Sequence, residues 1–158
     1  SRSSAASDVY KRQLEPYALA GIDQKYANLH LDQGIMVQRV RKDHEKARYH
    51  FKQAMHYYPE SAKRLLSLME QQFLSKNYEA AYYYSLALLY LNYPDRPTSF
   101  RAGIHCALEA ALYQEALQLS RQYVQEMRDD QMINLVVSRL ESNTNIDSLK
   151  FLFSRKSQ

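Results

Sequence analysis

One short pattern recurs three times along the sequence at nearly constant spacing. The tetrads His-Glu-Lys-Ala, Tyr-Glu-Ala-Ala and Tyr-Gln-Glu-Ala end at Ala47, Ala81 and Ala116. These alanines are 34 and 35 residues apart. A period of this length indicates one supersecondary unit that is built several times and stacked on itself, because a single unit cannot bury its own apolar faces.

The composition favours helices for that unit. The chain has 158 residues, of which 46% are hydrophobic, so one sizeable core is expected. Only three glycines and four prolines interrupt it. No strand-like run bounded by turn residues is apparent. We therefore predict an all-α fold of about eight helices.

The first repeat shows how two such helices would pack. Ala47, Phe51 and Ala54 place two small residues and a ring on one helical face, and Pro59 ends that helix. Asp43 stands where an N-cap residue is expected. The segment upstream, residues 26–40, contains Gly34 and is expected to form the partner helix. The segment therefore predicts an antiparallel helix pair.

With this period and spacing, the chain resembles the tetratricopeptide repeat family from about residue 27 to residue 128. The resemblance implies a right-handed α-solenoid of antiparallel helix pairs, each with an A and a B helix, with repeats at about 27–59, 62–94 and 97–128. The second repeat departs from the pattern at Ser85, where a large ring is usual, and the third lacks the closing proline. Other paired-helix arrays, such as the Sel1-like repeat or a plain bundle, remain alternatives.

We expect a single helical domain over 14–156. Leu14–Ile22 is interpreted as the B helix of an incomplete repeat, and 130–156 as a C-terminal capping helix pair. Residues 1–13 resemble the translation of a sequencing adaptor, or else a disordered leader, and are set aside. Without them the net charge of +4 falls to +2.

Residues able to carry catalysis, bind a cofactor or ligate a metal are not arranged in a recognisable pattern. The five histidines form no His-Glu-x-x-His motif and no pair four residues apart on a predicted helix. Cys106 is the only cysteine and lies among apolar residues, as a core residue would. Tyr82, Tyr83 and Tyr84 point about 100° apart on a helix, which favours core packing over a stacking platform. We therefore expect no enzyme activity, cofactor or metal.

The resemblance places a binding groove on the A helices. The positions that face a ligand in this family correspond here to Asn28, Leu31, Ile35, Gln38, Arg39, Lys63, Leu66, Glu70, Phe73, Arg101, His105 and Glu109. This mixture of apolar and charged residues suits a segment with one or two apolar anchors. The family's two-carboxylate clamp needs Lys and Asn where this chain has Leu31 and Ile35, so that clamp is absent.

The expected function is a protein–protein interaction module that holds a peptide or protein segment, as the C-terminal part of a larger protein. Two alternatives are a small stand-alone adaptor similar to type III secretion chaperones, and a spacer that acts by self-association. The charge of the domain is too low to indicate nucleic-acid binding, and no apolar run reaches the roughly 20 residues that membrane insertion needs. The compartment stays open, with the cytoplasm preferred to the periplasm.

Overall fold

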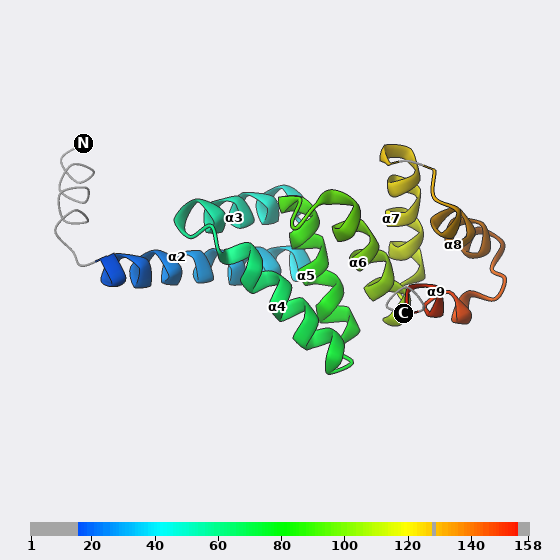
Figure 1. The fold of residues 1–158 in the computed structure, drawn as a ribbon, viewed down its shortest axis with the longest axis horizontal. Coiled ribbons are helices and arrows are strands. Elements are labelled where there is room, and N and C mark those ends of the chain that lie inside the picture. Colours follow the sequence, from blue (N-terminus) through cyan, green and yellow to red (C-terminus); the bar gives the residue numbers. More distant parts are fainter. Residues whose placement is uncertain (1–15, 128, 155–158) are drawn as a thin grey trace. The chain divides into compact units, whose positions relative to one another are not determined.

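The structure, a computed structural model, describes residues 16–127 and 129–154, with side chains from residue 21 onward. Over these residues the chain is all-α and has no strand, as predicted (Figure 1). Its α-helices are α2 (Pro16–Met36), α3 (His44–Tyr57), α4 (Ser61–Leu74), α5 (Tyr78–Leu91), α6 (Arg96–Glu109), α7 (Tyr113–Glu126), α8 (Gln131–Ser142) and α9 (Phe151–Ser154). The π-helical segment η1 (Val37–Arg41) follows α2, and the 3-10 turn η2 (Ile146–Ser148) precedes α9.

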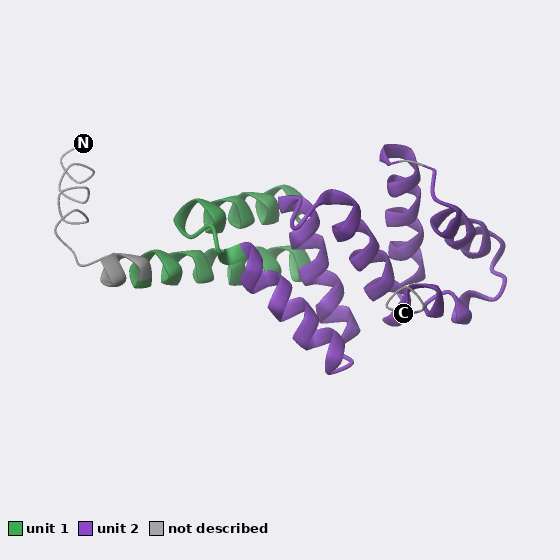
Figure 2. Cartoon of the chain, in the orientation of Figure 1, with its two compact units in different colours: residues 1–61 green, residues 62–158 purple. Residues whose placement is uncertain are grey.

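The contacts divide the chain into two compact units, residues 1–61 and 62–158 (Figure 2). We predicted one domain over 14–156, and each unit is described by itself below. The expected leader, residues 1–13, lies outside the described residues. No described helix is both long enough and apolar enough to cross a membrane.

The first unit is a pair of helices, α2 and α3, that pack closely because small residues lie between them. Ala47, Phe51 and Ala54 are fully buried on α3. A Cβ atom added to Gly34 of α2 would lie 2.5 Å from the ring of Phe51, so the ring occupies the space that glycine leaves. Asp43 caps α3 by accepting a hydrogen bond from the backbone nitrogen of Lys46 at 3.1 Å. The predicted packing residues and N-cap are confirmed.

Helix α2 differs from the prediction, because it continues through Ile22 without a turn and reaches Met36. The expected separate helix over Leu14–Ile22 is therefore wrong for the described part, which begins at Pro16. Between 17 and 36 the sequence has no proline, and the one glycine before Gly34, Gly21, is tolerated within the helix. Nothing in this stretch breaks the hydrogen-bond ladder.

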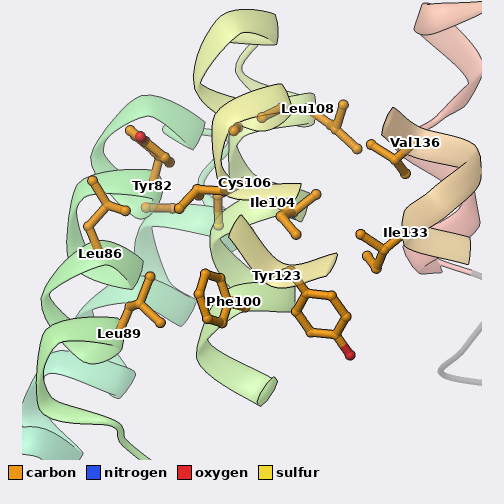
Figure 3. Close-up of a cluster of buried hydrophobic side chains, with 14 of the residues drawn as sticks. Tyr82, Leu86, Leu89, Phe100, Ile104, Cys106, Leu108, Tyr123, Ile133 and Val136 are labelled. Atoms are coloured by element: carbon orange, nitrogen blue, oxygen red, sulfur yellow. The ribbon is translucent and has the colours of Figure 1, made fainter. Parts of the chain in front are cut away.

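The second unit has a core formed by buried residues of α5, α6, α7 and α8 (Figure 3), and side chains of α4 and α9 pack against it. Phe100 and Ile104 of α6 are fully buried at its centre. In the close-up, Ile104 extends towards Ile133 and Val136 of α8. Consecutive helices pack in order, α5 on α6, α6 on α7 and α7 on α8. This order follows from the short connections between them.

The tyrosines of α5 serve the core, as predicted. Tyr82 and Tyr83 are 6% and 8% exposed, and their rings meet edge to face at 5.3 Å. Burial raises the pKa of the Tyr82 hydroxyl, with a smaller contribution from Glu115. Tyr84 is half-buried. The three rings therefore do not form one surface for stacking a ligand.

The helix ends of the second unit are formed by residues other than glycine, since Gly103 lies inside α6. Asp95 caps α6 by accepting a hydrogen bond from Thr98 N at 2.8 Å, and Pro97 lies in its first turn. Asn77 stands at the N-cap of α5 but makes no side-chain cap bond. Lys76 and Ala111 adopt left-handed backbone angles with φ of 63° and 57°, where glycine is usual.

The C-terminal region holds one full helix rather than a pair of similar length. Helix α8 has 12 residues, whereas the following part of the predicted cap forms the turn η2 and the four-residue helix α9. Leu149 is nevertheless fully buried, and Leu152 and Phe153 pack against the core. The apolar residues of this second segment therefore pack against the core without forming a long helix.

Candidate functional site

The strongest candidate for a binding site is a pocket of about 390 Å³ between α4 and α6. Its volume lies in the range of about 300–1,000 Å³ that ligand pockets occupy. The lining is mostly apolar and comprises Met69, Glu70, Phe73, Leu74, Ala102, His105 and Cys106. Both helices contribute residues spaced three or four apart, so that each presents one face to the same space.

An aromatic contact joins α4 and α6, the two walls of the pocket. The ring of Phe73 lies 4.9 Å from that of His105, and it also meets Tyr78 edge to face at 5.1 Å. On α9, Phe153 stacks on His105 with centroids 5.1 Å apart and planes at 12°. His105 is therefore held between two phenylalanine rings, which fixes its orientation at the pocket wall.

The charge of His105 follows from this enclosure. Burial lowers the pKa of the imidazole, and the nearby carboxylate of Glu109 partly offsets that effect. Its Nε2 lies 3.5 Å from Oε1 of Glu109, which is too long for a good hydrogen bond. The lowered pKa favours the neutral form of the ring, and Glu70 is the acidic residue among those that line the pocket.

Cys106 borders the pocket but is not placed for nucleophilic chemistry. Its side chain is 2% exposed, and burial raises the pKa of the thiol to about 12. The thiolate is the reactive form of cysteine, so the group is unreactive at neutral pH. It acts as a small apolar residue of the core and the pocket wall.

The structure brings together some of the residues that sequence reasoning assigned to the groove. Glu70, Phe73 and His105 line the pocket, and Glu109 lies next to His105. Lys63 is exposed and Leu66 half-buried on α4, and neither lines the pocket.

Arg101 is engaged in a different contact. It forms an ion pair with Asp130, whose Oδ2 also accepts a hydrogen bond from the hydroxyl of Tyr123 at 3.2 Å. Oδ1 of Asp130 accepts from the backbone nitrogens of Met132 and Ile133, at 3.0 and 3.3 Å. The arginine thus joins α6 to the first turn of α8 rather than facing a ligand.

The candidates of the first repeat do not form one accessible face. Leu31 and Gln38 are 2% and 0% exposed, so both are closed to a ligand as they are placed. The side-chain amide of Gln38 has no hydrogen-bond partner among the described residues. Asn28 and Ile35 are half-buried, and Arg39 is exposed. The reason for this burial is that α2 turns this side towards α3.

Met69 and Ala102 were missed as lining residues. Met69 lies four residues before Phe73, and Ala102 lies three before His105, so helical periodicity alone would have placed them on the same faces. Helical periodicity could not have predicted the contact between Phe153 and His105, because these residues are 48 positions apart in the sequence.

A second polar arrangement, absent from the sequence predictions, lies in the first unit. Nδ1 of His30 on α2 and Nδ1 of His50 on α3 are 3.0 Å apart, so one ring donates a hydrogen bond and the other accepts it. Tyr57 stacks on the ring of His30 with centroids 5.8 Å apart. The pKa of His50 is lowered by burial first, and then by His30 and Lys46.

The hydrogen-bonded pair of His30 and His50 predicts a loss of stability at mildly acidic pH. The folded state disfavours the charged form of His50, so its contribution is present above the unfolded pKa of 6.5 and is lost as the pH falls through the lower folded value. We expect the thermal midpoint to drop between about pH 7 and 5, and to drop less in His50→Gln. His56→Gln changes an exposed histidine of the same helix and should keep the wild-type profile. Identical profiles for all three proteins would contradict this prediction.

Comparison with known proteins gives no further assignment: no protein family, curated protein or solved structure matches the chain. The resemblance to tetratricopeptide repeats therefore rests on the spacing of residues in the sequence, and it stays a prediction.

Proposed function

We propose that the chain is a protein-binding module of the tetratricopeptide-repeat type, and that the pocket between α4 and α6 receives an apolar side chain of a partner segment. One observation carries the proposal. Glu70 and Phe73 on α4 and His105 on α6, assigned to a groove from repeat positions alone, line the same pocket. A pocket that is mostly apolar and fixed by aromatic contacts is what an anchor side chain needs.

The charges specify the partner further. Glu70 is an exposed acidic residue at the pocket, while burial lowers the pKa of His105. A partner segment is therefore expected to carry a leucine or aromatic anchor with a lysine or arginine nearby. The cation would add selectivity and association rate more than affinity. Self-association, the second candidate function, is favoured by a different surface on α2.

The test fills the pocket without removing a core residue. A library of random 12-residue peptides displayed on phage provides the probe, and one selected peptide is labelled for fluorescence anisotropy. Ala102→Phe places a ring in the pocket and should weaken binding at least about tenfold, since anchor residues dominate such interfaces. Gln118→Phe adds the same ring at an exposed position of α7 and should change affinity less than about twofold.

The charge is tested separately. Glu70→Gln should weaken the selected peptide a few-fold at low salt and have little effect at high salt. If selection yields no peptide, or if the peptides bind Ala102→Phe as tightly as the wild type, the pocket is not the binding site.

A further inference from the structure

Helix α2 carries apolar residues on two sides, although only one side faces α3. The side towards α3 is closed, with Ala27, Leu31 and Val37 all buried. A second set of large apolar residues on the same helix stays open to solvent. Ile22, Tyr26, Leu29 and Met36 are 36%, 50%, 58% and 46% exposed, and Tyr26, at the edge of this set, also stacks on the ring of Tyr57 of α3 with centroids 5.4 Å apart. A helix of a single two-helix layer would need only the first of these sides.

The exposed set follows a regular spacing. Its members lie at 22, 26, 29 and 36, and the step of seven contains Gln33, which is also exposed. Alternating steps of four and three are the a and d positions of a heptad, which place side chains on one seam at 3.5 residues per turn. Gln33 is then a polar residue at a core position, of the kind that specifies register.

We infer that this seam, defined by Ile22, Tyr26, Leu29, Gln33 and Met36, binds the same seam of a second copy of the chain in antiparallel orientation. Tyr26 of each copy lies opposite Leu29 of the other, and Ile22 opposite Gln33. The inference is independent of the pocket between α4 and α6.

The flanking charges select this arrangement. In an antiparallel pair the g positions of the two helices face each other, and here they are Lys25 and Asp32, both exposed. With Tyr26 opposite Leu29, Lys25 of each copy faces Asp32 of the other, which gives two opposite-charge pairs. Shifting the pairing by one heptad would bring Asp32 of one copy against Asp32 of the other.

A parallel pairing has no comparable support. Its g positions face the e positions five residues further along the other helix. Lys25 would then face His30, and Asp32 would face the buried Val37, so no opposite-charge pair forms. The antiparallel register is therefore the one that the charges favour.

Sedimentation equilibrium of the full chain at about 1–500 µM tests the inference, since a seam of this length is expected to give a weak dimer. Leu29→Gln should weaken dimerisation more than about 100-fold, because each dimer loses two buried leucines. Leu135→Gln replaces a leucine that is 36% exposed on α8, outside both the pocket and the seam, and should leave dimerisation unchanged. A monomer over the whole range, or a dimer that persists in Leu29→Gln, would overturn the inference.

Charge reversal tests the register. Lys25→Asp and Asp32→Lys should each weaken the dimer about three- to tenfold at low salt, and the double variant should regain wild-type affinity. A double variant as weak as the single ones would overturn the antiparallel register. Because Leu29 lies on α2 and does not line the pocket, failure of the dimer leaves the peptide-binding test interpretable, and the reverse also holds.

Discussion

Replacing Gly34 by alanine is expected to destabilise the first unit by about 2–3 kcal/mol, whereas the same change at Gly21 should stabilise it by about 0.5–1 kcal/mol. At Gly34 the new Cβ would lie 2.5 Å from one carbon of the Phe51 ring and 2.9 Å from another. The ring is fully buried, so it cannot move towards solvent. At Gly21 the new Cβ meets no atom of the described residues within 4 Å, and only the cost of glycine in a helix is removed.

Urea unfolding followed by far-ultraviolet circular dichroism measures both changes. The two variants add the same methyl group to the same helix, so helix propensity cancels and the difference reports the contact with Phe51. Equal shifts of the unfolding midpoint in the two variants would show that α2 and α3 do not pack as described.

Removing the carboxylate of Asp130 should cost the second unit about 2–4 kcal/mol. This side chain is 14% exposed and serves three partners, the ion pair with Arg101, the hydroxyl of Tyr123 and the first turn of α8. Asp130→Ala removes a helix cap, worth about 1 kcal/mol, and also leaves a partly buried guanidinium without its counter-charge. Nη1 of that arginine already lacks a hydrogen-bond partner among the described residues.

Two further variants separate these contributions. Asp130→Asn keeps a good capping residue and removes the charge, so its loss of stability should fall between wild type and Asp130→Ala. Asp129→Ala removes the neighbouring carboxylate, which is exposed, and should cost less than about 0.5 kcal/mol. Thermal or urea unfolding gives the order of stability of these variants. A loss of stability in Asp129→Ala as large as that in Asp130→Ala would exclude the role assigned to Asp130.

The helices were predictable because their signals are local. Asp43, followed three turns later by Ala54 and then by Pro59, marks one helix from cap to end. Pro97 in the first turn of α6 and the buried alanines Ala81 and Ala116 likewise follow from short-range rules of sequence.

The contacts that define the candidate sites were less predictable, because they join distant parts of the chain. His30 and His50 lie on different helices, and their hydrogen bond depends on how α2 packs against α3. Phe153 reaches His105 from a four-residue helix that has no clear periodic pattern. The phase of the expected repeats assigned Glu70, Phe73 and His105 to a groove, and these residues line one pocket because each helix presents one face to it.

The same phase argument failed in the first repeat. It assigned Leu31 and Gln38 to a ligand-binding face, but these residues are buried. Helix α2 has apolar residues on two sides, so its sequence does not reveal which side meets α3. If the wrong side of α2 is assumed to face α3, the positions predicted to be buried and those predicted to be accessible are exchanged.

The left-handed residues at the helix ends have a consequence for how the sequence can change. Lys76 and Ala111 have a positive φ. This backbone conformation costs a residue with a Cβ about 1 kcal/mol or more relative to glycine. Neither side chain lines the pocket or the α2 seam. Each is therefore a place where mutation to glycine can add stability without altering a binding surface. Such a reserve lets a chain tolerate destabilising substitutions elsewhere while new specificity evolves at its surfaces.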